Sequence, residues 1–155
     1  MTKKNIIIIL IIALVLLGSL VIYNNYHSQK QISIDGVNFT LPQGFQVSGT
    51  NSVGDITINN GTTSVFITSY DNPDIHYCMN QYENATNKAN NTLKFSNKTI
   101  NNMVVYKSDI INGKKGSNHY WFNFNNKTYS IYTWEETPNI DKITSELINS
   151  VHQSK

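Results

Sequence analysis

The stretch SIDGVNFTLPQGF, residues 33–45, decides the fold expected for this chain. Its centre is Asp35-Gly36, a residue pair typical of the two-residue type I′ turn that joins the strands of a β-hairpin. Apolar and polar residues alternate on both sides of this pair, and Pro42 ends the second alternating segment. The stretch therefore predicts the opening hairpin of a folded domain.

An apolar run, IIIILIIALVLLGSLVIY at positions 6–23, precedes the hairpin. It carries no charge, and a helix of this length spans about 27 Å, close to the thickness of a bilayer's hydrocarbon core. A cleaved signal peptide has a shorter apolar region followed by a small-x-small site, and no such site follows the run. Its end also lacks the cysteine that a lipid anchor needs. The run predicts an uncleaved transmembrane helix.

The charges beside this run predict its orientation. Lys3 and Lys4 precede it, whereas the polar residues that follow carry no positive charge until Lys30. The positive-inside rule keeps residues 1–5 in the cytoplasm. Residues 24–31 are then a short polar linker, and residues 32–155 form one extracytoplasmic domain. The expected location is the cell membrane, crossed once.

Turn residues and periodicity predict the order of elements in this domain. A second hairpin is expected within residues 55–70, around another type I′ pair, Asn60-Gly61. The following segment changes to a helical period, with Asn72 as the N-cap, Pro73 in the first helical position and a length of about 17 residues.

Four strands and a second helix complete the expected domain. The strands are expected at about 93–100, 103–112, 118–125 and 128–134, with turns at NGKKGSN and NNK between the last three. The terminal helix is expected to have Thr137 as its cap and Pro138 in its first position, with an apolar stripe from Ile140 to Val151. The fold class is α+β: a single antiparallel-sheet domain with two packing helices, behind an N-terminal transmembrane helix.

The motif IDGVNFTLPQGF, the late aromatic hairpin and the terminal KITSELINSV helix resemble a group of small exported proteins with a PsbP/Mog1-like α/β sandwich. The resemblance covers about residues 32–152 and extends to uncharacterised membrane-anchored proteins of methanogenic archaea. It implies a sandwich fold and a binding or accessory role. It carries over no catalytic residue.

Composition limits the possible partners. The sequence contains 23 Asn and 12 Lys but no Arg. From residue 24 onward, ten Lys balance ten Asp plus Glu, so the expected domain is neutral. A neutral domain without Arg lacks the basic surface that binds nucleic acid. The expected partners are the membrane itself and a neighbouring membrane or envelope protein.

The residue types that support catalysis do not form a recognisable set. Cys78 and His76 are two positions apart on the expected helix, so their side chains point in different directions. Cys78 lies on the apolar stripe, where a buried thiol behaves as a small hydrophobe, although His119 could approach it from elsewhere in the chain. The four histidines lack the spacing of a metal site. We therefore expect no catalytic, cofactor-binding or metal-ligating residue and no cofactor.

Two groups of residues remain as candidate sites. Trp121, Tyr132 and Trp134 belong to an aromatic hairpin, whose rings are expected to fill the core on one face of the sheet. The alternative is that these three residues lie on the outer face and form an exposed platform for a glycan or a partner. Asn60 and Asn126 lie in expected turns within Asn-x-Ser/Thr sequons, which makes them candidate N-glycosylation sites.

These features together predict a non-enzymatic binding or accessory module of the cell envelope, held by a single membrane anchor. Two other interpretations stay open at this point: a small extracytoplasmic enzyme, whose site would bring Cys78, His119 and a carboxylate together, and a structural component of the envelope.

Overall fold

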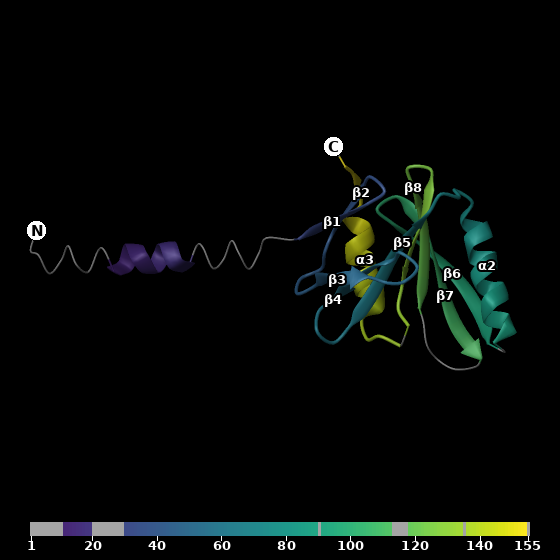
Figure 1. The fold of residues 1–155 in the computed structure, drawn as a ribbon. Coiled ribbons are helices and arrows are strands. Elements are labelled where there is room, and N and C mark those ends of the chain that lie inside the picture. Colours follow the sequence, from purple (N-terminus) through teal and green to yellow (C-terminus); the bar gives the residue numbers. More distant parts are fainter. Residues whose placement is uncertain (1–10, 20–29, 90, 113–117, 135, 155) are drawn as a thin grey trace, which may run out of the picture.

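The computed structural model describes residues 11–19, 30–89, 91–112, 118–134 and 136–154 (Figure 1). Beyond residue 30 the described chain forms two antiparallel sheets, a small one with the order β1-β2-β10 and a large one with the order β3-β4-β5-β9-β8-β7-β6. The elements are, in chain order, β1 (Gln31–Ile34), β2 (Val37–Thr40), β3 (Gln46–Thr50), β4 (Ile56–Asn59), β5 (Ser64–Tyr70), α2 (Ile75–Lys88), β6 (Thr92–Ile100), β7 (Met103–Asn112), β8 (His119–Phe124), β9 (Lys127–Tyr132), α3 (Ile140–Asn149) and β10 (His152–Gln153).

The opening hairpin has the predicted turn. Ile34 pairs with Val37, and the two residues between them have positive φ angles, 50° at Asp35 and 78° at Gly36. Positive φ at both central positions is what a type I′ turn requires. The pairs 101–102 and 125–126, which join β6 to β7 and β8 to β9, repeat this pattern with Asn at both positions. Asn tolerates the left-handed region because its short side chain can bond to nearby backbone, so part of the Asn excess has a structural use.

The prediction of a type I′ turn at Asn60-Gly61 is wrong. Asn59 pairs with Ser64, so four residues rather than two connect β4 to β5. Only Gly61 of the predicted pair has a positive φ, 93°. The Asn60 Oδ1 atom accepts hydrogen bonds from the backbone nitrogens of Thr62 and Thr63, at 3.1 and 2.9 Å. This side-chain acceptor stabilises a wider loop at the expense of the two-residue turn.

Both predicted helix caps are displaced. The N-cap of α2 is Asp74, whose Oδ1 accepts hydrogen bonds from the backbone nitrogens of His76 and Tyr77, at 3.0 and 3.3 Å. Asn72 instead accepts a bond from the backbone nitrogen of Asp74 and forms the turn before the helix. The helix α3 begins at Ile140, after Asn139 in a left-handed conformation, so Thr137 and Pro138 lie before it.

The large sheet packs between two layers (Figure 1). On one face, α3 and the β1–β2 hairpin enclose the main core, in which Phe39 contacts Phe122 and Tyr129 edge-on. On the other face, α2 covers a smaller cluster formed by Ile75, Cys78, Met79 and Trp121. The predicted α+β architecture with two packing helices is therefore observed, with one helix on each face of the sheet.

The small sheet differs from the expected single sheet. The strand β10 pairs with β2, where His152 faces Asn38 and Gln153 faces Val37. The Ser154 backbone nitrogen also donates to the Gly36 carbonyl oxygen at 2.8 Å. A two-residue strand is too short to show alternation in the sequence, so its pairing with the opening hairpin was not predicted.

The predicted transmembrane segment is described only in part. Residues 11–19 are helical, and every side chain in this segment is exposed. Residues 6–10 and 20–23 of the predicted span, and residues 24–29 of the predicted linker, lie outside the described residues. In the described parts of the chain, no helix has both the length and the apolar character needed to cross a bilayer.

Candidate functional site

The strands β8 and β9 place Trp121 and Tyr132 on the face of the sheet that α2 partly covers, and Trp134 follows the end of β9. Trp121 and Tyr132 are nearly inaccessible there, with 1% and 6% of their surface exposed, whereas Trp134 is 64% exposed. Trp134 packs edge-on against Phe66 and Tyr132, at centroid distances of 5.9 and 5.5 Å. Of the three residues in the candidate platform, only Trp134 presents an accessible ring.

The burial of Trp121 and Tyr132 follows from a layer of stacked rings that the sequence did not reveal. The His119 ring lies between Tyr82 of α2 and Tyr132 of β9, with centroids 4.0 and 4.6 Å away. Trp121 adjoins the same His119 ring at 5.3 Å. Strand alternation puts His119 and Trp121 on one face, but only the β8–β9 register and the position of α2 bring Tyr132 and Tyr82 to them.

A buried polar network borders this stack. The Tyr132 hydroxyl donates a hydrogen bond to the Asp55 carboxylate, which also accepts one from the Asn51 side-chain nitrogen at 2.9 Å. Burial, together with the bond to Asp55, raises the pKa of Tyr132 above its ordinary range. Burial lowers the pKa of His119 to about 3, and the nearby Asp55 carboxylate only partly opposes this shift. His119 is therefore a neutral ring at pH 7.

Cys78 occupies the core position expected from the apolar stripe of α2. It is 8% exposed and belongs to the cluster under that helix. Burial raises the pKa of its thiol, which disfavours the thiolate form needed for nucleophilic attack. A neutral His119 with a strongly lowered pKa is also a weak proton acceptor at pH 7. Neither residue lines the clefts described below.

We expect Cys78 to react slowly with thiol reagents in the folded protein. Because the thiol is buried and its pKa is raised, modification has to await local opening of α2. Labelling with a maleimide, followed by intact-mass measurement with and without denaturant, checks this. Rapid labelling without denaturant, at the rate of an unfolded control, would contradict the core position.

The two sequons of the sequence analysis lie on exposed turns. Asn60 is in the β4–β5 loop, and Asn126 has a φ of 60° in the β8–β9 turn. In the second sequon, Thr128 is buried and its hydroxyl donates to the Asn123 side-chain oxygen at 2.9 Å. Modification of either asparagine stays a prediction.

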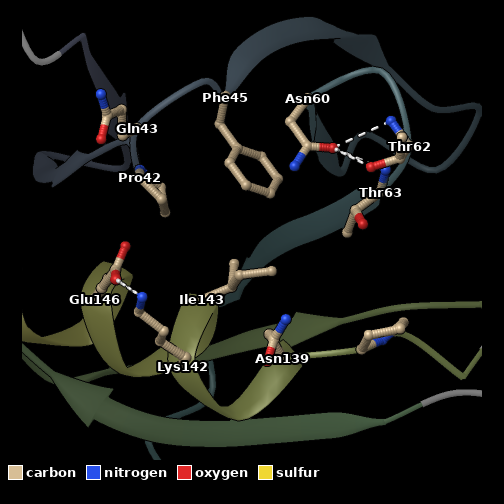
Figure 2. A pocket seen from close by; sticks show the side chains of 11 residues that line it. Pro42, Gln43, Phe45, Asn60, Thr62, Thr63, Asn139, Lys142, Ile143 and Glu146 are labelled. Carbon is tan, nitrogen blue, oxygen red and sulfur yellow. Dashed lines mark hydrogen bonds and ion pairs between the residues drawn. The ribbon is translucent and has the colours of Figure 1, made fainter.

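An open cleft lies between the start of α3 and two loops (Figure 2). One wall is the first half of α3 with the residues just before it. The facing wall is formed by the β2–β3 connection and the β4–β5 loop. Its volume is about 690 Å³, within the range of small-molecule sites. The residues that line it are Pro42, Gln43, Phe45, Asn60, Thr62, Thr63, Pro138, Asn139, Lys142, Ile143 and Glu146.

Local sequence features shape both walls of the cleft. In the β2–β3 connection, the Phe45 backbone nitrogen donates to the Pro42 carbonyl oxygen at 3.0 Å, and Gly44 takes a positive φ of 83°. The resulting turn directs the Phe45 side chain towards the core, and only 6% of the surface of Phe45 is exposed. On the other wall, the left-handed Asn139 starts α3 without a side-chain capping bond, so its amide is not used to cap the helix.

The cleft lining is mostly uncharged and polar. Three side-chain amides, from Gln43, Asn60 and Asn139, combine with the hydroxyl groups of two threonines. Among the residues that the structure describes, the charged ones in the lining are Lys142 and Glu146, one helical turn apart, with 3.9 Å between the Lys142 Nζ and Glu146 Oε1 atoms. A shallower cleft of about 490 Å³ continues along α3 and shares Pro42, Gln43 and Glu146 with the first.

Sequence reasoning missed this cleft because its three segments are far apart in the chain. Pro42 was interpreted only as the end of a strand, and Asn60 only as part of a turn and of a sequon. The signal that could have marked them is the grouping of amide and hydroxyl side chains in consecutive turns. Among the residues that the structure describes, no group of three His, Cys, Asp or Glu side chains could hold a metal ion.

Comparison with known proteins supports the fold and nothing beyond it. No family model and no curated protein sequence matches the chain. The solution structure of cyanobacterial PsbP (CyanoP) from Synechocystis sp. PCC 6803 is similar, with a TM-score of 0.54 over 81% of this chain and 92% of that one, at 12% identity. The chain has a PsbP-like fold.

A crystal structure from Bacteroides thetaiotaomicron VPI-5482 was also matched, with a TM-score of 0.47 and 12% identity. The match covers 82% of this chain and 49% of that one. The predicted PsbP-like fold is therefore confirmed by the cyanobacterial structure.

Proposed function

We propose that this protein is a single-pass, membrane-anchored module that displays a PsbP-like domain outside the cell membrane and binds an envelope component there. The observation that carries the proposal is the exposed apolar helix at residues 11–19. Leu14 and Val15, for example, are 70% and 66% exposed. A helix that is apolar on all sides is ordinarily buried in a core or in a membrane, and the folded domain does not bury this one.

The charges flanking residues 6–23 support the orientation. Leu, Ile and Val each favour insertion by about 0.3 to 0.6 kcal/mol, so a run rich in them favours the bilayer by several kcal/mol. Lys3 and Lys4 then remain on the cytoplasmic side. The resemblance to membrane-anchored archaeal proteins, expected from the sequence over about residues 32–152, is part of the same proposal.

Two surfaces support a binding role for the domain. The cleft beside α3 is concave and offers amides and hydroxyls to a ligand. Trp134 adds an exposed ring, and exposed aromatic residues are enriched where proteins contact partners. We therefore propose a binding or accessory role through the cleft and Trp134, with no nucleic-acid partner because the domain is neutral.

The orientation can be tested with a C-terminal tag on the full chain. We expect protease added to intact cells or spheroplasts to remove the tag, because the domain lies outside, while a cytoplasmic control protein stays intact. Immunoblotting of the membrane fraction reads out the result.

A charge-swapped variant is the matched control. Lys3→Glu and Lys4→Glu combined with Asn24→Lys and Asn25→Lys move the positive charge to the other end of the run, and we expect the tag to become protected. A tag on the native sequence that survives while a surface protein is digested would show that the proposed orientation is wrong.

A further inference from the structure

We propose that the cleft beside α3 is a binding site for a neutral saccharide. This inference rests on the proposed extracytoplasmic binding role and names the ligand class for the same site. Figure 2 shows Pro42, Gln43, Phe45 and Asn60 on one side of the cleft, facing Asn139, Lys142, Ile143 and Glu146 across an open space. The two neighbouring clefts, of about 690 and 490 Å³, share three lining residues and leave room for more than one sugar ring.

The polar groups of the cleft match the hydroxyl groups of a sugar. Each hydroxyl is both a donor and an acceptor, and an amide side chain offers both functions in one plane. Gln43 and Asn139 provide such amides from opposite walls. The Asn60 carbonyl oxygen is occupied by bonds from Thr62 and Thr63, which fixes its side chain and leaves its amide nitrogen as a donor for a ligand.

The apolar groups of the cleft match the remaining surface of a sugar ring, which consists of C–H bonds. Ile143 supplies this surface between the polar groups, together with the small accessible parts of the buried Pro42 and Phe45. Ligand sites commonly combine apolar walls with a few placed polar groups in this way.

Charge favours a neutral ligand over an anionic one. Lys142 is the one cation among the described residues of the lining, and the Glu146 carboxylate one helical turn away offsets it. An acidic saccharide or a phosphate group would lose its hydration in the cleft without gaining a dedicated cation.

The cleft does not match the common modes of peptide recognition. None of the described residues lining the larger cleft belongs to a strand, so these residues offer an extended peptide no sheet edge to pair with. A helical or proline-rich peptide requires an apolar or aromatic groove, whereas Phe45 is the one aromatic residue in the described part of this lining.

Titration of the full chain in detergent micelles tests the inference. The protein is made in a host without N-glycosylation, so that Asn60 is unmodified, and the Ile methyl groups are labelled for NMR. The probes are cellotetraose, maltotetraose and chitotetraose, with oligogalacturonate and a neutral Ser-Gly-Asn heptapeptide as comparisons. We expect at least one neutral tetrasaccharide to shift the Ile143 methyl signal with a Kd of about 1 mM or below, while the Ile75 signal under α2 stays in place.

Two substitutions locate the site. Asn139→Gly removes the amide but permits the left-handed backbone that φ 61° requires, and Gln43→Ala removes an exposed amide. We expect the double variant to bind about tenfold more weakly or worse, while Gln81→Ala, an exposed control on α2, binds normally.

Several results would overturn the inference. They are the absence of an Ile143 shift with all three neutral tetrasaccharides, tighter binding of oligogalacturonate or of the heptapeptide, and unchanged affinity in the folded double variant. None of them affects the membrane orientation, which the protease experiment measures separately.

Discussion

Replacing Trp121 with alanine is expected to lower the free energy of unfolding by about 3 to 5 kcal/mol, the usual cost of removing a large aromatic side chain from a core. Only 1% of Trp121 is exposed. Its ring lies 5.4 Å from Tyr82, 5.3 Å from His119 and 6.2 Å from Phe95, measured between centroids. These rings come from α2, β8 and β6. The cavity left by Trp121→Ala would therefore loosen the packing of α2 against the sheet.

Chemical denaturation followed by far-UV circular dichroism measures this effect, and Trp134→Ala is the matched control. Trp134 is 64% exposed, and its ring makes T-shaped contacts with Phe66 and Tyr132. We expect its removal to cost about 1 kcal/mol or less. Equal costs for the two substitutions would contradict the assignment of Trp121 to the core and Trp134 to the surface.

Lowering the pH from 7 to 4 is expected to destabilise the domain through His119. Its pKa is about 3 in the folded protein and 6.5 in the reference state. Between these values the unfolded chain binds a proton that the folded chain does not, so stability falls as the pH decreases. For one such group the free energy of unfolding falls by about 1.4 kcal/mol per pH unit. The total loss is roughly 3 kcal/mol by pH 4.

His119→Phe keeps a ring in the stack between Tyr82 and Tyr132 but removes the titrating group. We expect that the stability of this variant does not decrease between about pH 6 and 4.5 as that of the native protein does. Denaturation midpoints measured across this range give the slope. His152→Gln, at an exposed position, is the control that should retain it. An unchanged slope in His119→Phe would show that another group is responsible.

The carboxylates are expected to lose their stabilising contribution at a lower pH than that at which His119 destabilises the domain. The two effects can therefore be separated by pH. Burial alone would raise the pKa of Asp141, but hydrogen bonds from Lys107 and Tyr120 outweigh it and the pKa is lowered. The stability from Asp141 is therefore present above its unfolded pKa and is lost as the pH falls towards its folded pKa. This loss lies below the window in which His119 acts.

The parts of the fold that were predicted correctly depend on local features. Asp35-Gly36 and Asn125-Asn126 adopt the expected turns because positive φ angles restrict the residues that can occupy them. The stripe of α3 was predicted because Ile140, Leu147 and Ile148 recur at helical spacing and are buried together.

The errors arose where two local signals competed. Asn60-Gly61 has the composition of a type I′ pair, but the Asn60 side chain bonds to Thr62 and Thr63 and forms a longer loop. Asn72 and Asp74 are both good helix caps, and only Asp74 has its oxygen within reach of the first free backbone nitrogens of α2. The spacing of residues alone does not rank such alternatives.

The sequence by itself determined the α+β class, the order of the two helices and of most strands along the chain, and the apolar N-terminal run, because turn chemistry and periodicity are properties of neighbouring residues. Only the tertiary structure decided which side chains meet. Strand register placed His119 beside Tyr132, and the packing of α2 added Tyr82 and buried Trp121. The cleft likewise exists only because α3 lies against two distant loops. Such contacts depend on how elements pack across long sequence separations, which local patterns do not encode.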